Sequence, residues 1–130
     1  MKQLRNYINI RKRKSTIKAT DETIHQIVLD EIDRLGLDAD LNHIDVSEVT
    51  NMNSLFSRAA YDNFDLKKYE GLNPDITLWN VSNVEIMNYM FYGCDKFNHD
   101  ISGWDVRNVK YKDFMFYGCD IKEEYKPKFK

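Results

Sequence analysis

The sequence lacks any stretch that is long and apolar enough to span a membrane. Residues 1–10 are polar and no apolar run of signal-peptide length follows them, so no signal peptide is visible. A glycine-rich phosphate loop, a nucleophile elbow and an H-E-x-x-H motif are missing as well. We therefore expect a cytoplasmic protein, of a bacterial host cell or encoded by a phage. We expect no enzymatic activity, no catalytic residue and no cofactor.

Acidic residues are missing from the first 18 positions, which hold seven Lys/Arg, whereas residues 19–130 hold 12 Lys/Arg and 21 Asp/Glu. A basic arm on an acidic body favours contact with a polyanion or self-association, and a solvated arm is the alternative interpretation. The candidate phosphate contacts are Arg5, Arg11, Lys12, Arg13 and Lys14.

Cysteine is scarce: Cys94 and Cys119 are the only two, and they lie 25 residues apart. A disulfide between adjacent coils is geometrically conceivable, but Ala59 at the matching position of an earlier repeat favours buried thiols. His99 is close in sequence to Cys94, yet a zinc site lacks a fourth ligand and a familiar spacing. We predict no metal site.

What the sequence does contain is an internal repeat. The segment 79–84 (Trp-Asn-Val-Ser-Asn-Val) returns at 104–109, and Met-Phe-Tyr-Gly-Cys at 90–94 returns at 115–119, both after 25 residues. A weaker copy at 44–59 precedes the second by 35 residues, which places a ten-residue insertion between them. A period of this size is typical of solenoids.

Within a repeat, the alternation at Trp104-Asp105-Val106 predicts a short strand. The spacing of Val84, Met87, Met90, Phe91 and Cys94, after an S-x-x-E capping box, predicts a short helix. The expected fold class is therefore α/β: a short leucine-rich-repeat-like solenoid of about three strand–helix repeats with an N-terminal capping helix at 21–35.

The predicted organisation is a basic arm at 1–18 and a single repeat domain at 19–130, with repeats at about 40–59, 72–94 and 97–119 and a tail at 120–130. Lys112 stands where the other repeats have Met52 and Met87. A charge there is tolerable if the outer side of the last coil faces water. A homodimer through this C-terminal end is an open alternative, because three coils are near the lower limit for a solenoid.

The segments 83–94 and 97–106 resemble the repeat unit of the BspA-like leucine-rich repeat surface-protein family. The similarity is specific over residues 72–119 and good over 39–59. It implies a leucine-rich-repeat-like fold and a role in binding other proteins, not in catalysis.

We predict that a protein partner, whose identity the sequence does not indicate, binds the concave strand face and the insertion at 60–71. The candidate residues are Asp45, Asn80, Asp105 and Arg107 on that face, and Tyr61, Phe64 and Tyr69 in the insertion. A phage or mobile-element accessory factor acting on a host protein is one concrete version. The alternatives are a nucleic-acid-associated protein anchored by its basic arm and a fragment of a surface adhesin.

Overall fold

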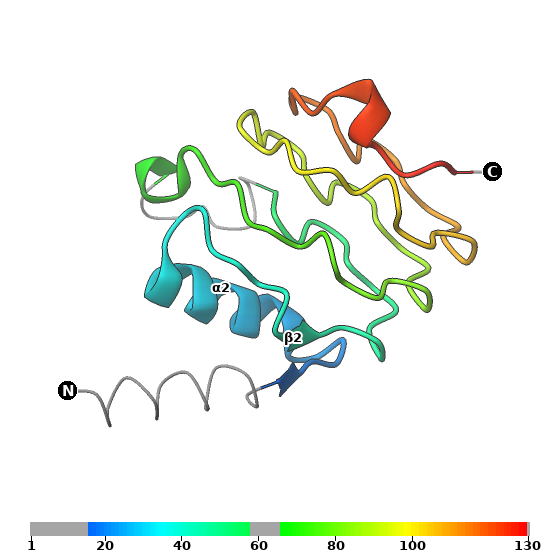
Figure 1. Ribbon diagram of the computed structural model, residues 1–130, viewed down its shortest axis with the longest axis horizontal. Helices are drawn as coiled ribbons and strands as arrows, with labels where there is room; N and C mark the ends of the chain where they lie inside the picture. The colour runs from blue at the N-terminus through cyan, green and yellow to red at the C-terminus, as the bar shows by residue number, and fades with distance from the viewer. Residues whose placement is uncertain (1–15, 58–65, 130) are drawn as a thin grey trace.

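The computed structural model describes residues 16–57 and 66–129 (Figure 1). Among these residues there is one α-helix, α2 (Ile24–Leu35), and one parallel pair of two-residue strands, β1 (Ile17–Lys18) and β2 (Ile44–Asp45). Two short 3-10 helices follow, η2 (Leu66–Tyr69) and η3 (Glu123–Tyr125). The rest of the described chain consists of turns that stack on one another, and we call this stack the pile. Helix α2 lies across the N-terminal end of the pile, and the C-terminus lies at the opposite end (Figure 1).

Helix α2 buries one apolar stripe, which includes Ile24, Val28 and Ile32. It begins three residues later than the sequence predicts, because residues 21–23 form a turn in which Thr23 N–H donates to the carbonyl of Thr20. The helix ends at Leu35 as predicted, and Gly36 follows it at φ 101°, a conformation that glycine adopts without steric cost.

The sequence repeats are in register in space. Isolated parallel bridges join Asn51 to Ile86 and Ile86 to Tyr111, which are the offsets of 35 and 25 residues seen in the sequence. Successive repeats therefore lie side by side, each using the same backbone positions to bond the next.

The core consists of equivalent side chains from successive repeats. Trp79 and Trp104 are buried, and each indole N–H donates to a carbonyl of the preceding repeat, at 2.9 Å and 3.2 Å. The rings of Phe56, Phe91 and Phe116 form a stack with centroid separations of 5.6 Å and 5.5 Å. Each new repeat thus covers the aromatic ring of the one before it.

The predicted solenoid of three strand–helix repeats is wrong. The single described α-helix precedes the repeats, and β2 is the only described strand inside one. Residues 84–94 form turns instead of the predicted helix, and residues 104–106 form no strand.

The hydrogen bonds explain this difference. Backbone N–H groups of Met87, Tyr89 and Phe91 donate sideways to carbonyls of the next repeat, so they are not available to close helical turns. Tyr89 also has φ 59°, which is incompatible with a right-handed helix. The apolar spacing of this segment reflects tight turns whose side chains point into the core.

Candidate functional site

The predicted binding residues Asp45, Asn80 and Asp105 lie at equivalent positions of the three repeats. Each side-chain oxygen accepts a hydrogen bond from the backbone N–H two residues later, at distances of 2.9, 3.1 and 3.3 Å. This is the Asx-turn geometry. The row therefore has a structural role within each repeat, whatever else it binds.

Asp75 and Asp100 have the same structural role at another turn of their repeats. Asp75 accepts from Thr77 and Asp100 accepts from Ser102, through the backbone N–H and the hydroxyl in each case. The hydrogen bonds with Ser102 hold the pKa of Asp100 below its ordinary value.

The end of the predicted row is charged and exposed. The Arg107 guanidinium lies 2.9 Å from the Asp105 carboxylate, and their side chains are 70% and 41% exposed. The hydrogen bond from Arg107 is the main reason that the pKa of Asp105 is lowered. The pKa of Asp45 is lowered mainly by its hydrogen bonds with Ser47.

The insertion and the arm are only partly within the described residues. Tyr69 is buried, and its hydroxyl donates to the Asp33 carboxylate at 3.1 Å, so this ring packs beside helix α2 instead of facing a partner. Tyr61 and Phe64 lie outside the described residues. The five basic candidates Arg5, Arg11, Lys12, Arg13 and Lys14 also lie outside them.

The described surface has a feature that our sequence analysis missed: an array of four aromatic rings. Tyr89, Tyr92, Phe114 and Tyr117 form what we call the aromatic surface. Tyr89 stacks on Phe114 at 5.5 Å and Tyr92 stacks on Tyr117 at 5.4 Å, across the two repeats. Within each repeat the two rings meet edge to face, at 5.6 Å and 6.0 Å. The exposed fractions of Phe114 and Tyr117 are 57% and 61%.

The backbone that carries these rings is unusual. Ser54, Tyr89 and Phe114 have φ of 60°, 59° and 55°, so the same left-handed residue recurs in all three repeats. A positive φ is rare for bulky side chains and costs about 1 kcal/mol or more. The conformation turns these side chains away from the core, since the neighbouring Met90 and Met115 are buried.

The first repeat shows that the fold does not require the rings. Ser54 occupies the position of Tyr89 and Phe114, and Ser57 occupies the position of Tyr92 and Tyr117. Serine is compatible with the same turn, so the backbone does not require aromatic residues at these positions. In the second and third repeats they add exposed apolar area. Their 25-residue recurrence, opposite serine in the first repeat, is a sequence signal that could have identified this surface.

Metal-ligating and nucleophilic side chains are dispersed in the described part of the chain. No group of three His, Cys, Asp or Glu residues there is placed to hold a metal ion. Both cysteines are thiols; Cys94 is buried, as predicted, and Cys119 is partly buried. Burial raises the pKa of the Cys119 thiol, which makes it a poor nucleophile.

A family model covers most of this chain. It is DUF285, described as a Mycoplasma protein of unknown function, and it matches residues 32–126. This chain belongs to the DUF285 family. The match spans all three repeats of the DUF285 chain and therefore both pairs of rings in the aromatic surface. Searches among curated proteins and among solved structures gave no match. Within residues 16–57 and 66–129, no helix has the length and apolar character needed to cross a bilayer.

Proposed function

We propose that this chain is a non-enzymatic protein-binding module and that the aromatic surface is its principal contact site. The observation that carries the proposal is that four aromatic rings are stacked in register on the surface, where the fold itself tolerates serine. Tyr and Phe are enriched at protein interfaces, and contiguous exposed apolar area marks binding sites.

The rings are also suited to binding because they are ordered before a partner arrives. Each is held by a stacked neighbour and an edge-to-face neighbour, so little side-chain entropy remains to be lost on association. Truncating an aromatic residue at the centre of an interface typically costs about 2 kcal/mol or more, a loss of about 30-fold in affinity.

The resemblance to BspA-like repeats supports the same class of function, since it is most specific over residues 72–119, which include the aromatic surface. The exposed pair of Asp105 and Arg107 remains a second candidate contact, as do Tyr61 and Phe64 in the insertion. A phage or mobile-element factor acting on a host protein and an adhesin fragment are two settings in which such a module would work.

The second candidate function is association with nucleic acid. Exposed aromatic rings also stack on unpaired bases, and the basic run at Arg11–Lys14 would contact phosphates. Charge-driven binding of this kind weakens steeply with salt, whereas contact through the aromatic surface does not.

Affinity capture from the native source separates the two functions. We expect the immobilised chain to retain one discrete protein at both 0.1 M and about 1 M salt, because apolar contacts are not screened. The double variant Phe114→Ser/Tyr117→Ser copies the first repeat and should lose that protein. Leu78→Ser is the matched control, because it removes an apolar side chain that is 80% exposed, more than Phe114 or Tyr117, and lies outside the aromatic surface.

Two results would contradict the proposal. One is that the double variant, folded by circular dichroism, retains the captured protein as well as the wild type does. The other is capture of DNA or RNA that disappears at high salt or on deletion of residues 1–18, which would favour the second function. Loss of the protein on Asp105→Arg would extend the interface to the predicted row.

A further inference from the structure

The two ends of the pile of repeats differ in their backbone hydrogen bonds. Within the pile, alternate N–H groups of one repeat donate to carbonyls of the next. In the second repeat the donors are Met87, Tyr89, Phe91 and Gly93, and the acceptors are the carbonyls of residues 111, 113, 115 and 117, at 2.7 to 2.9 Å. These four bonds all run from the earlier repeat to the later one, whereas the N–H groups of Lys110 and Tyr111 donate in the opposite direction, to the carbonyl of Glu85.

In the described part of the chain, no fourth repeat receives the bonds of the third. The equivalent donors are the N–H groups of Lys112, Phe114, Phe116 and Gly118, which we call the donor edge. None of them has an acceptor within residues 16–57 and 66–129. The carbonyls of Lys112, Phe114 and Phe116 already accept N–H groups from their own turns. From Lys112 to Gly118 this edge therefore offers mainly donors.

The C-terminal tail covers only one half of this end. Tyr125 supplies a carbonyl that accepts from Ile101 N–H at 3.0 Å, and Lys122 N–H donates to the Asn98 side chain. Asn98 N–H donates to Asn73 in the same way one repeat earlier. The tail thus imitates the start of a fourth repeat until Pro127 leads the chain away.

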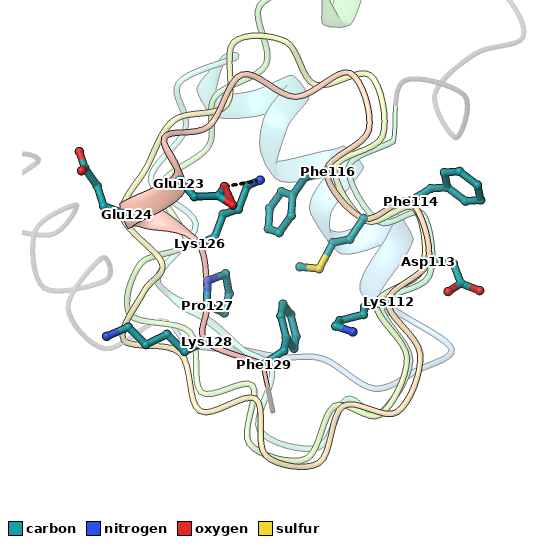
Figure 2. Close-up of a pocket in the computed structure, with 11 residues that line it drawn as sticks. Lys112, Asp113, Phe114, Phe116, Glu123, Glu124, Lys126, Pro127, Lys128 and Phe129 are labelled. Carbon is teal, nitrogen blue, oxygen red and sulfur yellow. Dashed lines mark ion pairs between the residues drawn. The ribbon is translucent and has the colours of Figure 1, made fainter.

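The other half is a hollow of about 570 Å³ beside the donor edge. Figure 2 shows the rings of Phe116, Pro127 and Phe129 facing this space, which Met115 also lines. The outer face of Phe116 is the position that a fourth phenylalanine would cover, since Phe116 covers Phe91 in the same way.

Charge around the hollow favours a ligand that supplies acceptors. The ammonium groups of Lys112 and Lys126 lie 5.4 Å and 5.2 Å from the centroids of Phe129 and Phe116. The carboxylate of Glu123 is paired with Lys126 at 2.8 Å, and the side chains of Asp113 and Glu124 point away from the hollow (Figure 2).

We propose that the donor edge binds an extended peptide segment of a partner protein, parallel to residues 112–118. Alternate carbonyls of the segment accept the four N–H groups, and an aromatic side chain of the segment fills the hollow over Phe116. This is strand addition to an exposed edge. It deepens the proposed protein-binding function and rests on it, but it uses a different surface.

A second copy of the chain is a poor occupant. Two copies related by a two-fold axis would place the donor edges against each other, which pairs donors with donors. At the N-terminal end of the pile, the Asn53 carbonyl is already bonded to His25 on α2, and the N–H groups of Thr50 and Asn51 are already bonded to Asp21. A segment that brings its own carbonyls is the complementary partner.

The probe is a synthetic peptide with the sequence of residues 109–119 carrying Cys119→Ser. Its carbonyls at 111, 113, 115 and 117 already match the preceding repeat, so the same spacing matches the donor edge. We would measure amide hydrogen exchange by NMR on the full chain, with and without millimolar peptide, and use a scrambled peptide as control.

In the free protein we expect the four donor-edge amides to exchange rapidly, whereas Met87, Tyr89, Phe91 and Gly93 are protected. The peptide should slow the donor-edge amides at least about tenfold, and the scrambled peptide should not. Lys112→Pro removes one donor together with the charge and should weaken the effect more than Lys112→Ala, which removes the charge alone.

The proposal is overturned if the peptide slows none of these amides, or if only residues of the aromatic surface respond to it. The proposed function is tested separately. Tyr92→Ser/Tyr117→Ser should keep the peptide effect, because Tyr117 contributes its side chain to the aromatic surface, while its N–H and carbonyl are bonded within the protein and are not part of the donor edge. If this variant loses the captured protein while the donor edge stays unresponsive to peptide in the wild type, only the present inference fails.

Discussion

The first prediction concerns Asp21, which closes the N-terminal end of the pile. Its carboxylate accepts from the N–H of Thr50 at 2.7 Å, the N–H of Asn51 at 3.1 Å and the Thr50 hydroxyl at 2.6 Å. In later repeats a single backbone carbonyl accepts the equivalent pair of N–H groups: the carbonyl of Thr50 for residues 85 and 86, and the carbonyl of Glu85 for residues 110 and 111. Asp21 therefore replaces the carbonyl of a missing earlier repeat.

The expected cost of Asp21→Ala follows from these bonds. A hydrogen bond to a charged group contributes about 1.5–3 kcal/mol when it is shielded from water. Asp21 is exposed, so water will replace part of the interaction. We expect a loss of about 1–2 kcal/mol in the free energy of unfolding, or about 3–10 °C in melting temperature for a chain of this size.

The assay is thermal and urea unfolding of the full chain, followed by far-UV circular dichroism. Glu22→Ala is the matched control, because it removes a neighbouring exposed carboxylate that makes no hydrogen bond with the described residues, and it should change stability by less than about 0.5 kcal/mol. Asp21→Asn keeps an acceptor oxygen and should fall between the two.

The pH dependence provides a second test of the same residue. Burial raises the pKa of Asp21, and the hydrogen bonds from Thr50 and Asn51 outweigh it, so the net shift is downward. A lowered pKa contributes stability above the ordinary carboxyl range, and that contribution is lost as the pH falls. The difference between wild type and Asp21→Asn should therefore shrink on acidification. Equal melting temperatures for Asp21→Ala and Glu22→Ala at neutral pH would refute the role of Asp21 as a cap.

Three further predictions follow from single side chains. Hydrogen bonds from Arg34, and then His43, hold the pKa of the buried Glu31 at about 2. Its contribution of about 2–3 kcal/mol to the free energy of unfolding should therefore disappear as the pH falls from about 4.5 to about 2. Glu31→Gln should flatten that part of a plot of unfolding free energy against pH. Trp104→Phe leaves a carbonyl of the preceding repeat without its indole donor and should lower the free energy of unfolding in urea by about 1–3 kcal/mol; an unchanged midpoint would contradict the bond at 3.2 Å. Gly118→Ala has room for its Cβ but places alanine at φ 72°, so calorimetry should show a loss of about 1 kcal/mol, and a gain in stability would show that the left-handed turn is not populated.

The sequence predicts well which residues are equivalent and buried. The 25- and 35-residue offsets reappear as bridges between Asn51, Ile86 and Tyr111, and both Trp79 and Trp104 are inside. These features follow from side-chain chemistry alone, because large apolar residues at a fixed period must be covered by their counterparts in the next repeat. Lys112 is exposed, as expected for a charge in the last repeat.

The backbone conformation within each repeat was not predictable in the same way. Apolar residues three or four apart are typical of a helix, but tight turns can bury the same positions. The N–H groups of Met87, Tyr89 and Phe91 donate to carbonyls of the next repeat instead of their own segment. The pattern of apolar side chains does not indicate which of these acceptors the backbone uses. The positive φ of Tyr89 could not be predicted from the sequence either, because bulky residues rarely adopt this conformation.

The candidate site was missed for a related reason. Sequence analysis placed the binding row at Asp45, Asn80 and Asp105, whose side chains are bonded within their own turns. An Asx residue can stabilise a turn or contact a partner, and its identity alone does not distinguish the two. Sequence analysis gave no role to Tyr89 and Phe114, which the left-handed turn directs outward.

The asymmetry between the two ends connects the fold to its proposed binding. At the N-terminal end the groups that would face an earlier repeat are met by side chains: Asp21 accepts the N–H pair, and His25 is bonded to a carbonyl. At the C-terminal end the tail provides only the carbonyl of Tyr125. N–H groups without a protein acceptor reduce stability little while water solvates them, so the fold tolerates the donor edge. A ligand that binds there has to displace this water. A protein that closes one end and leaves donors, an apolar hollow and the aromatic surface at the other has concentrated its binding capacity in the third repeat.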